Sequence, residues 1–205
     1  MRLATHPLAV AATCALALAL ANGLAHADAT FRGDAAHTGA SDAQAPRQFH
    51  RVKWTFATGG RIVSSPVHDH GVVYVGSDDG YVYAVDAASG RQRWKYRTGG
   101  PVPSTPAVAG ATVYVASYDG KVHAIDAATG LPRWRFATRG ERRFEAKNLH
   151  GFEPSAQTIA DPFDVYLSSP LVVAGRVYVG SGDGNVYALD AASGALAWTF
   201  ATGDV

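Results

Sequence analysis

The sequence predicts an all-β fold built from a repeat of about 40 residues. The segment Ala84–Trp94 returns with few changes as Ala124–Trp134 and again as Ala188–Trp198. Trp54 precedes the tryptophan of the first copy by 40 residues, the next interval is also 40, and the last is 64. Self-similarity at a fixed period is typical of repeat architectures. The interval of 64 residues is one period of 40 plus an insertion of 24 residues before the third copy.

Each copy contains four short extended segments separated by turns. In the first copy these segments are Ile62–Val67, Val72–Val75, Tyr81–Val85 and Arg91–Tyr96. The Asp79-Gly80 pair is a strong hairpin signal. Val72–Val75 lacks apolar/polar alternation, which favours a strand that is covered on both faces. Small four-stranded sheets covered on both faces are the blades of a β-propeller.

Three positions recur in every copy: an aspartate before a turn, a glycine inside it, and a tryptophan four residues later. They are Asp86, Gly90 and Trp94, then Asp126, Gly130 and Trp134, then Asp190, Gly194 and Trp198. A carboxylate in this position accepts hydrogen bonds from turn amides, and glycine supplies a positive φ. We expect each indole to pack between adjacent blades, beside a small alanine of the preceding strand. Because one site cannot contain a group from every blade, we predict no catalytic residue among them.

The pattern Ala-x-Asp-x-x-Thr/Ser-Gly-x-x-x-Trp is complete in all three copies and resembles the tryptophan-docking repeats of the pyrroloquinoline-quinone-like (PQQ-like) β-propellers. The resemblance covers residues 51–140 and 166–203, and Phe31–Gly39 is similar to a segment that often precedes such propellers. It implies the β-propeller fold. It implies less about function, because the family contains quinoprotein dehydrogenases, an outer-membrane assembly lipoprotein and other secreted proteins.

The predicted blades cover residues 61–97, 101–137 and 166–201 of a partial propeller at 51–205. Val52–Phe56, with Trp54 at its centre, resembles the last strand of a blade whose other strands are missing. Three blades and an orphan N-terminal strand fall short of the roughly four to eight that close a ring. We therefore expect an open arc with an uncovered apolar blade face, and a chain that is a fragment, a truncated product or part of an assembly. The expected partners are proteins or the missing propeller blades.

The N-terminus predicts secretion. Residues 1–27 combine Arg2, an apolar run and the small-residue site Ala25-His26-Ala27, as in a signal peptide, and residues 28–50 form an N-terminal extension. An uncleaved membrane anchor is the alternative. Cleavage removes Cys14, the only cysteine, and leaves equal numbers of basic and acidic residues. This balance favours neither nucleic acid nor an anionic membrane, so we expect a periplasmic or secreted protein with no stable membrane anchor after cleavage.

The insertion at residues 141–165 joins two blades and contains candidate interaction residues: His150, Glu153, Asp161 and Asp164. They are placed to bind a partner or a cation, because long loops on rigid scaffolds are where binding is usually built. A structured surface loop is the reading that the sequence favours, since no metal-ligand spacing is recognisable. The pair His68 and His70 is likewise interpreted as exposed turn histidines.

Two classes of function follow, together with the possibility of a truncated product without function. The first is a non-enzymatic protein-binding scaffold, in envelope or outer-membrane assembly, which needs no cofactor. The second is part of a quinoprotein dehydrogenase, for which the resemblance implies PQQ and a calcium ion held by carboxylate and amide side chains. The sequence favours the scaffold, because it shows no calcium-ligand constellation and no cysteine beyond Cys14.

Overall fold

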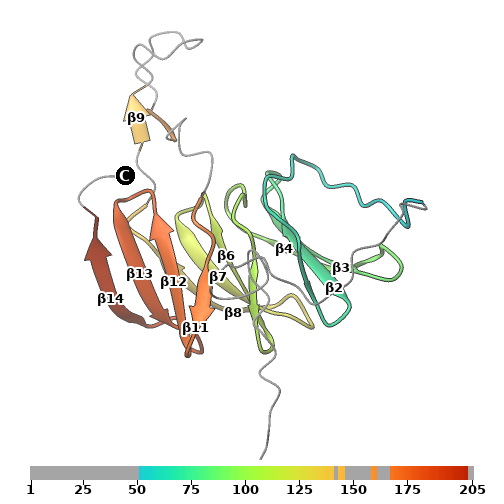
Figure 1. Ribbon diagram of the computed structural model, residues 1–205. Coiled ribbons are helices and arrows are strands. Elements are labelled where there is room, and N and C mark those ends of the chain that lie inside the picture. The colour runs from blue at the N-terminus through green and yellow to red at the C-terminus, as the bar shows by residue number, and fades with distance from the viewer. Residues whose placement is uncertain (1–50, 141–142, 146–157, 161–166, 203–205) are drawn as a thin grey trace, which may run out of the picture.

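The computed structural model describes residues 51–140, 143–145, 158–160 and 167–202. These residues form strands and turns and contain no helix, which confirms the all-β prediction. Three four-stranded antiparallel sheets stand side by side in chain order and do not close into a ring (Figure 1). The open propeller arc predicted from the repeats is therefore the observed architecture.

Each sheet is one blade, with its four strands in chain order. Blade 1 contains β1 (Val67–Asp69), β2 (Val72–Gly76), β3 (Tyr81–Asp86) and β4 (Gln92–Arg97). Blade 2 contains β5 (Ala107–Ala109), β6 (Thr112–Ser117), β7 (Lys121–Asp126) and β8 (Pro132–Ala137). Blade 3 contains β11 (Leu171–Val173), β12 (Arg176–Ser181), β13 (Asn185–Asp190) and β14 (Leu196–Ala201).

The strand register brings the same residues together in each blade. Trp94 on β4 lies directly opposite Ala84 on β3, and this pair recurs between β8 and β7 and between β14 and β13. The small alanine leaves room for the indole. The ladder shifts by one residue immediately beyond this alanine in all three blades, which bends the outer strand at the same point each time.

The inner strands hold neighbouring blades together near the propeller axis. β5 contacts both β1 and β11. Just before these strands, the Ser65 amide donates to Thr105 Oγ1 over 3.2 Å, and the Thr105 amide donates to Ser169 Oγ over 3.0 Å. The Ser-Ser-Pro and Ser-Thr-Pro segments of the repeat therefore connect the three blades by a line of polar contacts.

The hydrophobic core lies between the blades rather than within a single sheet. All six residues of β6, in the central blade, are buried, as expected for a strand covered on both faces. Val113 and Ile125 of blade 2 pack against blade 1, and Val177 and Leu189 of blade 3 pack against blade 2. Each blade thus depends on its neighbour for the burial of its apolar side chains.

Two predicted strands differ from the observed ones. Ile62–Val67 was expected to be extended strand, but β1 begins only at Val67, since the Pro66 nitrogen has no hydrogen to donate to a ladder. Val52–Phe56 lies along blade 1 but forms no ladder, because no further blade stands beside it in the described ranges. Within the insertion, β9 (Arg143–Glu145) and β10 (Thr158–Ala160) form a two-stranded antiparallel hairpin beyond the blades (Figure 1).

Candidate functional site

The aspartate of each repeat holds the turn before the outer strand. Asp126 Oδ1 accepts from the amides of Ala128 and Thr129 and from Thr129 Oγ1, at 2.9–3.1 Å. Its other oxygen accepts from Arg133 at 2.7 Å. The Arg133 hydrogen bond, followed by those from Thr129, lowers the pKa of Asp126 to about 2. Asp86 has the same arrangement with Ser89 and Arg93, and its pKa is lowered for the same reason.

This turn is also the surface on which the tryptophan of the preceding blade lies. The Trp94 indole Nε1 donates to the Ala127 carbonyl over 2.9 Å, across the boundary between blades 1 and 2. Gly130 has a φ of 74°, and a Cβ built on it would stand 2.8 Å from the Trp94 ring. The glycine therefore provides both the left-handed conformation and the space that the indole fills.

The same contact occurs at two other places. Trp54 donates to the Ala87 carbonyl at 3.0 Å and lies against Gly90, while Trp134 donates to the Ala191 carbonyl at 3.0 Å and lies against Gly194. Three of the four tryptophans thus join one segment of the chain to the turn of the blade that follows it.

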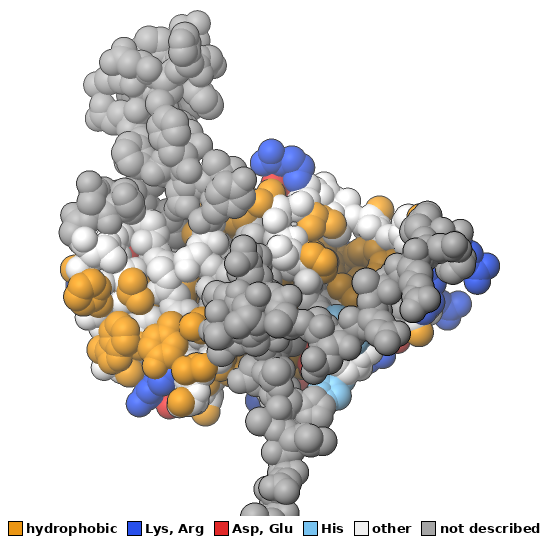
Figure 2. Space-filling view, in the orientation of Figure 1, with side chains coloured by type: hydrophobic (Ala, Val, Ile, Leu, Met, Phe, Trp, Pro, Cys, Tyr) orange, Lys and Arg blue, Asp and Glu red, His pale blue; other side chains and the backbone are white. Residues whose placement is uncertain are grey.

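Trp198 is the exception. We expected it to pack between blades, and this expectation is wrong, because no blade follows blade 3 in the described part of the chain. The Trp198 side chain is 47% exposed and Phe200 is 63% exposed, and all six residues of β14 are exposed. Figure 2 shows the hydrophobic side chains gathered on this side of the molecule, over the blade that contains β14.

We call the side of each blade that carries this tryptophan its tryptophan face, and the opposite side its back face. Cross-strand pairing defines three matching tryptophan faces: Tyr74, Gly76, Val82, Ala84, Trp94 and Tyr96; Tyr114, Ala116, Val122, Ala124, Trp134 and Phe136; Tyr178, Gly180, Val186, Ala188, Trp198 and Phe200. The first two pack against the back face of the next blade, the second with Trp134 and Phe136 still partly exposed, and the third is open. The open face of blade 3 is therefore an apolar surface whose chemistry matches two interfaces inside the same molecule.

The other end of the arc has an apolar groove. It lies on the back face of blade 1, has a volume of about 420 Å³, and is lined by Trp54, Phe56, Ile62, Pro66, His68, Val73, Val75 and Val85. The segment at residues 51–60 covers only part of this face, since Ile62 stays 49% exposed. The arc thus has an incompletely covered apolar face at each end.

A polar pair marks the back face of every blade, and blade 2 differs from the others. In blade 1 the Tyr83 hydroxyl donates to Asp79 over 2.6 Å, and Tyr187 and Asp183 of blade 3 form the same contact. Burial and the Asp79 hydrogen bond raise the pKa of Tyr83 to about 12. Blade 2 has His123 at this position, 3.2 Å from both oxygens of Asp119.

The His123 ring extends this cluster across the blade boundary. Its Nδ1 lies 3.0 Å from the Tyr96 hydroxyl, which also accepts a hydrogen bond from Arg135 Nε at 2.9 Å. The His123 side chain is almost fully buried. This cluster was not predicted from the sequence. The signal available was a histidine at the position where the other copies have tyrosine.

We predict that Asp119 makes folding stability depend on pH in the acid range. Burial alone would raise its pKa, but hydrogen bonds from His123 and the Gly99 amide and the nearby charges outweigh burial and lower it to about 2. Because the folded pKa lies below the ordinary value of 3.8, the stabilisation is complete above about pH 4 and is lost as the pH falls to about 2. In urea unfolding across this range, the free energy of unfolding should depend less steeply on pH for Asp119→Asn than for the unmodified chain. Equal slopes for the two proteins would contradict the prediction.

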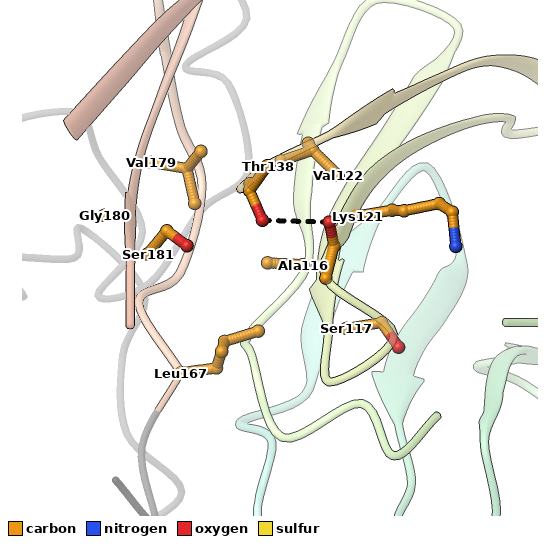
Figure 3. Close-up of a pocket in the computed structure, with 10 residues that line it drawn as sticks. Ala116, Ser117, Lys121, Val122, Thr138, Leu167, Val179, Gly180 and Ser181 are labelled. Carbon is orange, nitrogen blue, oxygen red and sulfur yellow. Dashed lines mark hydrogen bonds between the residues drawn. The ribbon is translucent and has the colours of Figure 1, made fainter. Parts of the chain in front are cut away.

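A very small cavity lies between blades 2 and 3. Figure 3 shows the side chains around it, which include Ala116, Leu167 and Val179. Its volume is about 10 Å³, enough for roughly one water molecule. Thr138 Oγ1 donates to the Gly120 carbonyl over 2.9 Å at its edge (Figure 3). This cavity is too small for a larger ligand, whereas the open apolar faces of the described residues lie at the two ends of the arc.

The remaining candidate residues are placed as follows. His68 and His70 are exposed, and His70 Nδ1 lies 2.8 Å from Asp69. Among the residues that the structure describes, no three His, Cys, Asp or Glu side chains are grouped as metal ligands would be. His150, Glu153, Asp161 and Asp164 fall outside the described residues, as do residues 1–50. In the described ranges no helix has the length and hydropathy that a membrane crossing requires.

The fold is similar to that of several solved structures. BamB from Moraxella catarrhalis is 25% identical with a TM-score of 0.54, and the match covers 71% of this chain and 39% of BamB. A europium-containing methanol dehydrogenase is 25% identical with a TM-score of 0.55, over 74% of this chain and 27% of the enzyme. The quinohemoprotein alcohol dehydrogenase from Comamonas testosteroni is 23% identical with a TM-score of 0.63, and the match covers 88% of this chain and 28% of the dehydrogenase. The chain thus spans well under half the length of each.

Sequence comparison identifies the family. No match is found among curated protein sequences. The family model described as outer membrane protein assembly factor BamB matches residues 36–162 and 153–204, which is most of the chain. The repeats, the three four-stranded blades and this match agree, and the chain belongs to this family of PQQ-like β-propeller repeat proteins.

Proposed function

We propose that this chain is a non-enzymatic protein-binding module of the cell envelope, and that its partner docks on the open tryptophan face of blade 3. The observation that supports this proposal is the exposure of Leu196, Trp198 and Phe200 together on one strand. Monomeric soluble proteins rarely leave such contiguous apolar surface uncovered, and tryptophan is the residue most enriched among interface hot spots.

The two buried faces of the same molecule indicate what kind of partner suits the open one. Each of them is covered by the next blade, which contributes apolar side chains, a glycine and a backbone carbonyl that accepts the indole hydrogen bond. A polypeptide with the same features would bury the Trp198 and Phe200 rings and accept a hydrogen bond from the indole N–H. We therefore propose that the partner is a protein, not a small molecule.

We propose the periplasm as the location. The support comes from the signal-peptide pattern of residues 1–27 and from the family description, which places its reference member in outer-membrane protein assembly. The insertion at residues 141–165, with His150, Glu153, Asp161 and Asp164, is proposed as a second contact region.

A binding experiment tests the proposed surface. The purified chain is immobilised, and the envelope proteins that it retains from a periplasmic extract are identified and compared with those retained by a Trp198→Ala, Phe200→Ala double variant. We expect the double variant to lose specific proteins that Leu131→Ala retains, because Leu131 is 65% exposed but lies in a blade 2 turn, away from the tryptophan face. If all three proteins retain the same set, the proposed surface is wrong.

Part of a quinoprotein dehydrogenase is the second candidate, favoured by the similarity to the methanol dehydrogenase. The chain is incubated with PQQ and calcium, and quinone absorbance and dye-linked alcohol oxidation are then measured. The protein-binding proposal predicts neither cofactor retention nor turnover. Turnover by the reconstituted chain would replace it with the enzymatic function.

A further inference from the structure

One hexapeptide occurs at both ends of the arc. Trp-Thr-Phe-Ala-Thr-Gly stands at residues 54–59 and again, identically, at residues 198–203. The first copy includes the segment that lies on the back face of blade 1, and the second includes most of the outer strand of blade 3. The two segments thus have the same side chains, but the first packs on blade 1 and the second is exposed.

The first copy of the hexapeptide occupies the place of a preceding blade. Trp54 donates to the Ala87 carbonyl, and the Phe56 and Tyr83 rings make a T-shaped contact with centroids 5.4 Å apart. On blade 3, Phe136 meets Tyr187 at the same 5.4 Å, and Trp134 donates to the corresponding alanine carbonyl. Blade 1 therefore accepts the Trp-Thr-Phe segment by the same contacts with which blade 3 accepts the outer strand of blade 2.

This segment fills only part of its site, because no inner strands stand beside it in the described part of the chain. The groove of about 420 Å³ next to Trp54 and Phe56 is lined by Val73, Val75 and Val85. The matching side chains of blade 3, Val177, Val179 and Leu189, are packed against the tryptophan face of blade 2. Among the residues that the structure describes, the back face of blade 1 lacks the remainder of a preceding blade.

We propose that a second copy of this chain supplies it: blade 3 of one copy docks, tryptophan face first, on the back face of blade 1 of the other, and Trp198 takes the place of Trp54. The inference rests on the proposed function, because it uses the same binding face and names its partner. The Trp198 N–H then donates to the Ala87 carbonyl of the second copy. Tyr178 donates to that carbonyl too, as Tyr74 and Trp94 both donate to the Ala127 carbonyl within the chain.

The exchange is favourable because the incoming blade buries more than the segment that it displaces. Trp198 and Phe200 make the contacts that Trp54 and Phe56 give up, so this part of the exchange is close to neutral. The additional buried apolar area comes from Tyr178 and Val186. Both are only partly buried here, while their counterparts in blades 1 and 2 are almost fully buried. Apolar area removed from water on both sides of the groove then drives association.

The contact joins two different surfaces, so it is heterologous. The described residues of two copies placed head to tail contain six blades, within the roughly four to eight that close a propeller ring. If the rotation between copies does not close the ring, the same contact repeats into an open chain. In either geometry the contact depends on Trp198 of one copy and on release of Trp54 in the other.

Two substitutions with opposite expected effects test the proposal. Sedimentation velocity over a concentration series is measured for the purified chain and for Trp198→Ala, Trp54→Ala and the double variant. We expect concentration-dependent association of the unmodified chain, weakened by about a hundredfold or more in Trp198→Ala, as for an interface hot spot. Trp54→Ala should associate more tightly, because it frees the site on blade 1, and the double variant should lie between the two single variants, since the freed site still accepts Phe200 and Tyr178.

The outcomes separate this inference from the proposed function. Circular dichroism of each variant confirms folding, and the exposure of Trp198 makes Trp198→Ala a mild change for the single chain. A monomeric unmodified chain, association that survives Trp198→Ala, or weaker association of Trp54→Ala would each overturn the second-copy proposal. If such a monomer still binds envelope proteins through the Trp198 face, the proposed function stands without it.

Discussion

Replacing Trp94 with alanine is expected to lower the free energy of unfolding by about 3–5 kcal/mol, the range for removal of a large buried aromatic side chain. Trp94 is 8% exposed and packs between blades 1 and 2. Its loss leaves a cavity against Gly130 and leaves the Ala127 carbonyl without the indole donor. Urea unfolding followed by circular dichroism measures the effect.

Trp198→Ala is the matched control for this substitution. The residue has the same position in its blade and the same alanine-facing register, but it lies on the open face of blade 3. At concentrations low enough to exclude association, we expect a loss of no more than about 1 kcal/mol. Equal losses for Trp94→Ala and Trp198→Ala would show that the inter-blade contact does not stabilise the fold as described.

Gly130→Ala is expected to be the second large effect, with a loss of about 2–5 kcal/mol. An alanine forced to a φ of 74° costs about 1–2 kcal/mol, and overpacking against the Trp94 ring, 2.8 Å from the new Cβ, adds about 1–3 kcal/mol. Gly110→Ala isolates the first contribution, because Gly110 also has a positive φ, of 56°, but a Cβ there meets nothing within 4 Å.

The comparison of the two glycine variants is made by the same urea unfolding measurement. We expect Gly130→Ala to exceed Gly110→Ala by about 1–3 kcal/mol, which is the contribution of the indole contact. In a Trp94→Ala background this difference should shrink, because the group that the new methyl meets has been removed. If the two glycine variants still differ by the same free energy in this background, the loss of stability comes from the turn itself and not from the indole contact.

The repeat made the blades predictable because its signals are local. An Asp-Gly hairpin, an aspartate that binds the amides of its own turn and an alanine opposite a tryptophan all act within a few residues or one strand pair. These signals recur in every copy, so a single period was enough to predict four strands and their order. The three-residue length of β1 was missed, because Ile62–Val67 has the composition of a strand although Pro66 interrupts its ladder.

Features that depend on the neighbouring blade were not predictable from one copy. Trp198 ends the same motif as Trp94, Ala-x-Asp-Ala-Ala-Ser-Gly-x-x-x-Trp, and what makes it exposed is that no blade follows it in the described residues. The cluster around His123 forms because Tyr96 of one blade meets it from another, 27 positions away in the chain. The candidate residues of the insertion, His150 among them, lie outside the described residues and remain a prediction.

One tryptophan face recurs in three blades, is covered by the next blade twice and is open once. Fluorine NMR of the chain labelled with 5-fluorotryptophan tests it directly, because the shift between H₂O and D₂O reports the solvent exposure of each indole. In dilute solution we predict the largest solvent shift for Trp198, assigned with Trp198→Phe, and small shifts for Trp94 and Trp134. Equal shifts for all tryptophans, or a large shift at Trp94, would contradict the account.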